Sequence, residues 1–216
     1  MKLSHHIPVT PWRAKTTWDF RPQMAFPLVV GLALFGLGEG LLVQSHWGAT
    51  PWTVFAQGVA RHTNWSLGWS TAAISVAVLL LWFPLRERPG FGTIANLIII
   101  AYVLDIVSTN LAIPHAYWLK SLYVVAAVAV IGVGSALYLT TALGPGPRDG
   151  LMTSLHRRFG ISVVYVRLTL EVTVLVVGWL MGGTVGVGTA FFAATIGFSI
   201  GASLNVMDRV VRRWSS

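Results

Sequence analysis

The stretch Gly144-Pro145-Gly146-Pro147-Arg148-Asp149-Gly150 has a counterpart in this chain, since Gly48-Ala49-Thr50-Pro51-Trp52-Thr53 stands 96 positions earlier. Matches that gather at Gly and Pro indicate a duplicated backbone, because these residues hold special dihedral angles and close contacts. The sequence therefore predicts two similar halves in tandem. The same ungapped offset joins further pairs: Gly36 with Gly132, Gly38 with Gly134, Leu41 with Leu137, Ser66 with Ser162, Gly90 with Gly186, Gly92 with Gly188 and Thr93 with Thr189.

The composition is that of an integral membrane protein. Of the 216 residues, 55% are hydrophobic and 10% are charged, which does not suit a soluble surface. The formal charge of +8 comes from short basic clusters between apolar runs, so we expect no nucleic-acid binding. The chain has no cysteine, which excludes disulfides and thiolate metal sites. Residues 1–24 lack an apolar core and predict a flexible basic tail rather than a cleaved signal peptide.

Six apolar runs are long enough to cross about 30 Å of hydrocarbon. Two shorter segments, 51–62 and 147–159, each begin with a proline, which the first turn of a helix tolerates. These short helices cannot span, so each is either interfacial or a re-entrant half-helix. We favour the interfacial form, with Trp52 as an anchor. The expected spans cover residues 25–46, 67–83, 91–111, 119–143, 162–181 and 187–205.

The predicted fold class is an all-α integral membrane protein with six transmembrane helices in two three-helix repeats. An odd number of spans in each half makes the second half enter the membrane from the opposite side, which gives an inverted topology. Each repeat carries its short non-spanning helix after its first span. The expected regions are a cytoplasmic basic tail at 1–24, a first membrane repeat at 25–113, a second at 114–206 and a second basic tail at 207–216.

The distribution of basic residues predicts the orientation. With six spans, one side of the membrane keeps only Arg61 and Lys120. The positive-inside rule then places both termini in the cytoplasm of a multi-pass protein of the bacterial inner membrane. The cytoplasmic side collects Lys2, Arg13, Lys15, Arg21, Arg86, Arg88, Arg148, Arg157, Arg158, Arg209, Arg212 and Arg213.

At the 96-residue offset several glycines and a proline of the two halves match, whereas several ionisable residues have no ionisable counterpart. This contrast suggests the hypothesis that folding uses the symmetric positions and function the asymmetric ones. At the 96-residue offset Glu39 faces Ser135, Trp52 faces Arg148, Thr53 faces Asp149, Thr71 faces Arg167, Ser75 faces Glu171 and Asp105 faces Gly201.

Several of these residues have both a structural and a functional interpretation. A carboxylate such as Glu39 inside a span costs about 2.5 to 3.5 kcal/mol, so it marks a site or needs a structural partner. Arg167 and Glu171 lie one helical turn apart and can pair within their own helix. Asp105 is near the end of its span and can reach water. The candidate substrate-binding residues are Glu39, Trp52, Asn96, Asp105, Pro147, Arg148, Asp149, Arg167 and Glu171.

Arg148 stands at the start of a short helix, where the macrodipole disfavours a cation. It therefore needs an anion nearby. Four candidates remain open: Asp149, a carboxylate from another span, a lipid phosphate, or an anionic ligand held jointly with the free N–H groups of the helix start.

Catalytic patterns are absent from the sequence. There is no His-Glu zinc spacing, no Gly-Lys phosphate loop and no Gly-x-Ser-x-Gly elbow. We therefore expect no enzymatic activity, no cofactor and no metal.

Motifs in both halves carry a resemblance to a known family. They are Pro-Gly-x-Gly-Thr at 89–93, Gly-Pro-x-Pro-Arg-Asp-Gly at 144–150, and Gly-Gly-Thr-Val-Gly-Val-Gly-Thr at 182–189. Over residues 25–205 the chain resembles the YczE/YyaS/YitT-like family of bacterial integral membrane proteins. The resemblance implies a cytoplasmic-membrane protein and transfers no functional residue.

Inverted repeats with buried ionisable groups predict a transporter or permease for a small polar or anionic solute, working by alternating access between the halves. The alternatives are a substrate-binding membrane subunit of a multi-component transporter and a non-transporting scaffold or assembly factor. Glu39 is the predicted proton-coupling group, because its protonation would depend on whether Arg148 or Arg167 is within reach. The expected partners are the lipid bilayer and the solute, with a possible homo-oligomer through the pairs Gly36/Gly40 and Gly197/Gly201.

Overall fold

The computed structural model describes residues 7–19 and 21–214, which fold into helices joined by turns. Six of the helices in these ranges are long and apolar enough to cross a membrane, namely α1, α3, α4, α5, α7 and α8. The other two, α2 and α6, have 13 residues each. The bounds are α1 (Pro22–Gln44), α2 (Pro51–Thr63), α3 (Leu67–Leu85), α4 (Phe91–Asn110), α5 (Tyr117–Leu139), α6 (Pro147–Phe159), α7 (Val163–Leu180) and α8 (Val187–Trp214).

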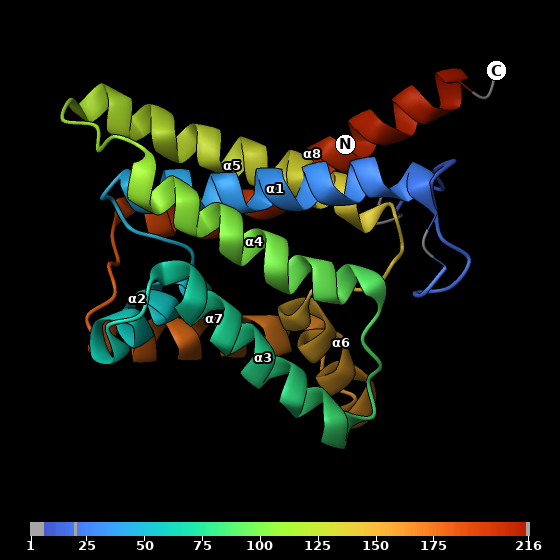
Figure 1. Ribbon diagram of the computed structural model, residues 1–216, viewed down its shortest axis with the longest axis horizontal. Helices are drawn as coiled ribbons and strands as arrows, with labels where there is room; N and C mark the ends of the chain where they lie inside the picture. The colour runs from blue at the N-terminus through green and yellow to red at the C-terminus, as the bar shows by residue number, and fades with distance from the viewer. Residues whose placement is uncertain (1–6, 20, 215–216) are drawn as a thin grey trace.

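The helices form two layers, with α1, α4, α5 and α8 in one and α2, α3, α6 and α7 in the other (Figure 1). In the first layer α1 packs on α4 and α5, and α5 packs on α8. In the second layer α2 packs on α3 and α7, and α6 packs on the same two helices. Each layer therefore takes helices from both halves of the sequence, so the halves interleave.

The predicted backbone repeat is visible in the residues with positive φ. The described residues with positive φ form four pairs at the 96-residue offset. Two pairs, His46 with Ala142 and Gly48 with Gly144, lie in the turns before α2 and α6. In the third pair Asn64 follows α2 and Gly160 follows α6, and in the fourth pair Arg86 follows α3 and Gly182 follows α7. Because positive φ is uncommon outside glycine, four coincidences indicate one backbone used twice.

Equivalent hydrogen bonds tie each half to the other. The Gly92 N–H donates to the Leu143 carbonyl at 2.8 Å, and 96 positions later the Gly188 N–H donates to the Trp47 carbonyl at 2.7 Å. The turn before each short helix is thus held by the last long helix of the opposite half.

The repeat-related helices α1 and α5 cross closely and run antiparallel. A Cβ on Gly31 would lie 2.8 Å from the Gly134 carbonyl oxygen, and one on Gly38 would lie 2.8 Å from the Ala127 carbonyl oxygen. The residue numbers of these contacts increase along α1 while they decrease along α5, so the two helices are antiparallel. Small residues permit this approach of two backbones.

The N-terminal segment differs from the expected flexible tail. Within residues 7–19 the Ala14 N–H donates to the Thr141 carbonyl at 2.8 Å, and the Thr10 hydroxyl donates to the Thr140 carbonyl at 3.0 Å. Both Ala14 and Thr10 are buried. The prediction of flexibility is wrong for this segment, because its polar groups satisfy carbonyls at the end of α5. Lys2, which entered the charge count, lies outside the described residues.

The last helix also differs from its expected range. The sequence suggested a span ending at residue 205 with a separate tail, but α8 continues to Trp214. The ion pair between Arg212 and Asp208, at 2.9 Å and one turn apart, supports the extra turns.

Candidate functional site

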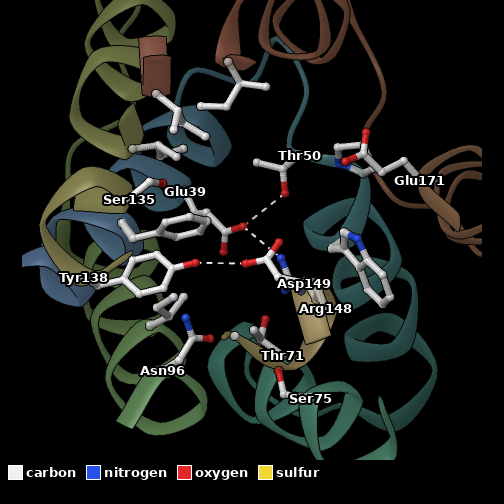
Figure 2. Close-up of a pocket in the computed structure, with 18 of the residues that line it drawn as sticks. Glu39, Thr50, Thr71, Ser75, Asn96, Ser135, Tyr138, Arg148, Asp149 and Glu171 are labelled. Carbon is white, nitrogen blue, oxygen red and sulfur yellow. Dashed lines mark hydrogen bonds and ion pairs between the residues drawn. The ribbon is translucent and has the colours of Figure 1, made fainter. Parts of the chain in front are cut away.

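A cavity of about 340 Å³ lies between the two layers and is lined by residues of all eight helices, including those in Figure 2. Its volume falls at the small end of the range for ligand pockets. It is therefore large enough for a small molecule.

Repeat-related residues meet in this cavity. Both members of eight offset pairs line it, so the cavity lies where the two halves face each other. The pairs are Phe35/Ile131, Glu39/Ser135, Thr50/Gly146, Trp52/Arg148, Thr71/Arg167, Ser75/Glu171, Asn96/Phe192 and Ile100/Ile196.

Glu39 is the most deeply buried carboxylate of the site, with an exposed fraction of 1%. Its Oε1 accepts a hydrogen bond from the Thr50 hydroxyl at 3.1 Å and one from Arg148 Nη1 at 3.2 Å (Figure 2). Thr50 is also the N-cap of α2, since its hydroxyl oxygen accepts from the Thr53 N–H at 3.3 Å. The start of α2 and the start of α6 thus converge on one carboxylate of α1.

The anion that pairs with Arg148 is Glu39. A carboxylate from another span was one of the four candidates that the sequence left open. The Arg148 guanidinium also lies 5.2 Å from the centre of the Trp52 ring, in cation–π range. Trp52 and Arg148 occupy equivalent positions in the two halves. The contact therefore joins two residues that differ in type at one repeated position. Arg148 must be removed from the cytoplasmic charge count, because its side chain is inside the protein.

Trp52 does not anchor a helix at an interface. Its side chain is 6% exposed, and the first turn of α2 is buried against α3 and α7. This corrects the expectation that Trp52 anchors α2 at the membrane interface.

Two further polar pairs line the cavity. The Tyr138 hydroxyl donates to Asp149 Oδ2 at 2.9 Å (Figure 2). Arg167 Nε donates to Glu171 Oε1 at 2.8 Å, which is the intrahelical pair that the sequence predicted. The Arg167 side chain is 45% exposed, so the cavity reaches the molecular surface beside α7.

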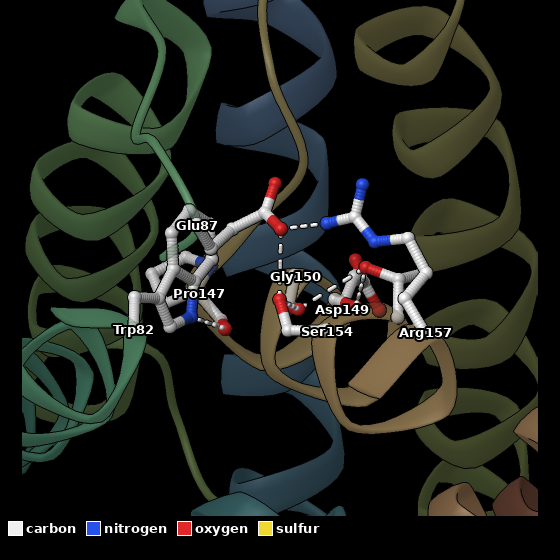
Figure 3. A network of polar contacts seen from close by, with 8 residues as sticks. Trp82, Glu87, Pro147, Asp149, Gly150, Ser154 and Arg157 are labelled. Carbon is white, nitrogen blue, oxygen red and sulfur yellow. Dashed lines mark hydrogen bonds and ion pairs between the residues drawn. The ribbon is translucent and has the colours of Figure 1, made fainter. Parts of the chain in front are cut away.

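Contacts with α3 hold the start of α6 in place. The Trp82 indole N–H donates to the Pro147 carbonyl at 3.0 Å (Figure 3). Gly150 lies against the Trp82 ring, where a Cβ would clash. Glu87, after α3, accepts from the Ser154 hydroxyl at 2.9 Å and pairs with Arg157. These contacts fix α6 and thereby position Arg148 and Asp149.

Seven of the nine candidate residues line the cavity, and Asp105 and Pro147 do not. Asp105 Oδ1 accepts the Gly68 N–H at 2.8 Å and so satisfies a free donor at the start of α3. Pro147 takes part through its backbone carbonyl, as described above. Asn96 lines the cavity beside Gly146.

Five polar residues of the cavity were not among the candidates, namely Thr50, Thr71, Ser75, Ser135 and Tyr138. A signal existed for each in the offset comparison. Tyr138 stands where the first half has Leu42, and Thr50 stands where the second half has Gly146. Thr71, Ser75 and Ser135 were noted only as the counterparts of charged residues, because a hydroxyl side chain carries no charge.

A family model described as a family of unknown function (DUF6198) matches residues 23–205. The chain belongs to this family. It is 44% identical over 204 residues to an uncharacterized protein of Haemophilus influenzae, with 94% of each chain covered. It is 30% identical to the uncharacterized membrane protein YczE of Bacillus subtilis, over 85% of this chain and 88% of the relative.

The uncharacterized protein YyaS of Bacillus subtilis is 22% identical over 83% of this chain and 92% of its own length. These matches confirm the resemblance to YczE and YyaS, and together with the six apolar helices they identify a multi-pass membrane protein. No solved structure matches the chain. The function must therefore be argued from the cavity.

Proposed function

We propose that this protein is a transporter that moves a small polar solute through the cavity by alternating access. The observation that carries the proposal is the cavity itself, which is lined by both members of eight repeat-related pairs and holds ionisable groups among apolar helices. Transporters built from repeats place their solute sites at the interface between repeats. Intramembrane ionisable residues mark transport pathways more often than packing.

The proposal includes an inverted topology in the bacterial inner membrane, with both termini in the cytoplasm. Two observations support it: the equivalent helices α1 and α5 run antiparallel, and the basic residues outside the cavity concentrate on one side of a six-span arrangement.

The two repeats pack differently, as alternating access requires. Helix α3 packs on α4, but the equivalent helices α7 and α8 have no comparable contact. In a second state α7 would move toward α8 while α3 leaves α4, although Val164 in place of Gly68 would keep the α7–α8 approach looser than the α3–α4 approach. The layer of α2, α3, α6 and α7 would then move against the layer of α1, α4, α5 and α8.

The absence of native cysteine makes this movement testable by cross-linking. Gly197 on α8 faces open space, whereas its equivalent Ala101 contacts Gly68 on α3. The double variant Val164→Cys/Gly197→Cys should therefore cross-link with a short bis-thiol reagent in native membranes. Complete absence of the cross-link, while single-cysteine variants react with a monofunctional thiol reagent, would argue against the second state.

Transport itself is tested in proteoliposomes that contain only this protein. We expect uptake of a labelled solute that the purified protein binds, and loss of uptake when the Val164→Cys/Gly197→Cys cross-link is formed. Binding without uptake would overturn the proposal and favour a substrate-binding subunit that needs an energising partner.

Glu39 is the proposed proton-coupling group, since its carboxylate bridges α1, the turn before α2 and α6. Glu39→Gln keeps the volume and removes the charge. It should abolish uptake driven by a pH gradient and leave part of the solute exchange at equal pH. Undiminished pH-driven uptake in this variant would assign Glu39 to structure alone.

A further inference from the structure

Three buried polar atoms lack a hydrogen-bond partner in the described part of the chain, and all three belong to residues that line the cavity. They are Glu39 Oε2, Trp52 Nε1 and Thr71 Oγ1. Their residues are 1%, 6% and 2% exposed, respectively. Buried polar groups without partners are rare because each costs free energy. Three in one cavity point to an occupant that satisfies them.

The three atoms define what the occupant must offer. The carboxylate oxygen of Glu39 accepts only, the indole N–H of Trp52 donates only, and the hydroxyl of Thr71 can do either. The occupant therefore needs an N–H or O–H donor for Glu39 and an acceptor for Trp52.

The charges of the lining favour a cationic donor. The cavity is lined by three carboxylates, Glu39, Asp149 and Glu171, and by two guanidiniums, Arg148 and Arg167. Both guanidiniums already contact a carboxylate, at 3.2 Å and 2.8 Å. The donor to the Asp149 carboxylate is the neutral Tyr138 hydroxyl. Asp149 is an exposed residue, and its carboxylate gives the lining one net negative charge, which a cation anywhere in the cavity would offset.

This balance disfavours an anionic ligand. The sequence suggested that Arg148 would hold an anionic ligand, but its guanidinium already forms an ion pair with Glu39 and lies over the Trp52 ring. An added anion would share Arg148 with Glu39, and the buried Glu39 carboxylate would repel it.

We propose that the ligand of the cavity is a small organic amine that also carries a neutral hydrogen-bond acceptor, such as a hydroxyl or carbonyl oxygen. Its ammonium group donates to Glu39 Oε2, its acceptor receives the Trp52 N–H, and the Thr71 hydroxyl completes the site. The aromatic residues Phe35, Tyr138 and Phe192 also line the cavity, and the face of an aromatic ring attracts a cation. This assignment rests on the proposed function, in which the cavity is the solute site.

The test uses four-carbon probes that differ in charge: 4-aminobutan-1-ol, 4-aminobutyrate, butane-1,4-diol and succinate. Each is added at equal concentration to the purified protein in detergent, and the midpoint of thermal unfolding is measured. A ligand that binds only the folded state raises this midpoint. We expect a rise of about 2–4 °C with 4-aminobutan-1-ol, a smaller rise with 4-aminobutyrate, and none with succinate. Preference for succinate, or no rise with either amine, overturns the assignment.

Two variants test the individual atoms. Trp52→Phe removes the unpaired N–H, and Thr71→Val removes the unpaired hydroxyl. Thr71→Val should leave the midpoint of the ligand-free protein unchanged or higher, because an unsatisfied buried group has been removed. Trp52→Phe also removes part of a buried ring, so it should lower this midpoint, but by less than the loss of an equal ring that also makes a hydrogen bond. Each should also weaken binding of 4-aminobutan-1-ol by about three- to tenfold, the effect of one lost hydrogen bond.

Trp82→Phe is the matched control, because the Trp82 indole N–H donates to the Pro147 carbonyl. It should lower the midpoint of the ligand-free protein while the rise caused by 4-aminobutan-1-ol remains. If Trp52→Phe lowers the midpoint as Trp82→Phe does and keeps the full ligand effect, the Trp52 N–H is paired within the protein and the assignment fails.

The failure of this assignment can be told apart from the failure of the proposed function. Amine binding without uptake into proteoliposomes would retain the ligand class and overturn transport. Uptake of succinate without amine binding would retain transport and overturn the ligand class.

Discussion

The helix pairs α3–α4 and α7–α8 have equivalent places in the two repeats but pack differently. In the first pair a Cβ on Gly68 would lie 2.5 Å from Asp105 Cβ, so only glycine permits the observed approach. In the second pair these positions hold Val164 and Gly201. Val164 is 63% exposed and α7 does not rest on α8.

This difference teaches that a repeated backbone does not impose repeated packing. The turns of both halves share their positive-φ positions and their cross-half hydrogen bonds. Packing between the long helices depends on side-chain size and on caps, and these have diverged. The shared turns and the divergent helix pairs therefore make different predictions for substitutions at equivalent positions.

The largest effects are expected in the shared turns. Gly48 and Gly144 have φ of +121° and +116°, and a Cβ on either would meet the hydroxyl of Thr189 or Thr93. Gly48→Ala and Gly144→Ala should therefore each cost about 3 kcal/mol, from backbone strain and crowding together. The shift of the unfolding midpoint in detergent measures this cost.

Gly160→Ala is the control for these turns. It combines a φ of +69° with open space, so it should cost about 1 kcal/mol from strain alone. Strong destabilisation by a change at Gly48 but not at Gly144 would contradict the equivalence of the two turns.

A smaller effect is expected where the helix pairs differ. Gly68→Val gives α3 the residue that α7 carries and should cost about 2 kcal/mol, because the added carbons overlap Asp105 and the Ala101 carbonyl. The midpoint of thermal unfolding should fall accordingly. Gly197→Ala places a methyl group in open space on α8 and should be neutral or slightly stabilising. Equal tolerance of both substitutions would show that glycine does not hold α3 against α4.

The smallest effect is expected at the cap of α3. Asp105→Ala removes the acceptor of the Gly68 N–H and should cost about 1 kcal/mol, while Asp105→Asn keeps an oxygen and should cost less. Thermal unfolding measures both variants, and 4-aminobutan-1-ol should still stabilise each of them. Loss of ligand binding with unchanged stability would return Asp105 to the solute site, where the sequence had placed it.

Much of the fold was predictable because its signals are local. Six long apolar runs predicted the six long helices, and prolines at 51 and 147 predicted where the short helices begin. The packed N-terminal segment was not predictable, since its order depends on carbonyls of Thr140 and Thr141 that are remote in sequence.

The site was predictable in its members more than in its contacts. The offset comparison singled out Glu39, Arg148 and Trp52 because they break the repeat. It left Glu39 as one of several candidate partners for Arg148, since a contact between residues 109 positions apart depends on how α1 and α6 pack.

The sequence by itself determined the membrane class, the repeat and the set of charged residues that have no charged counterpart in the other half. Hydropathy, glycine positions and residue identity are properties of the chain. Only the tertiary structure decided that the halves interleave in two layers, that the short helices point their first turns at Glu39, and that α3–α4 is packed while α7–α8 is not. The physical reason is that long-range packing is selected by the mutual fit of side chains and by the pairing of buried polar groups. Both depend on residues that lie far apart along the chain.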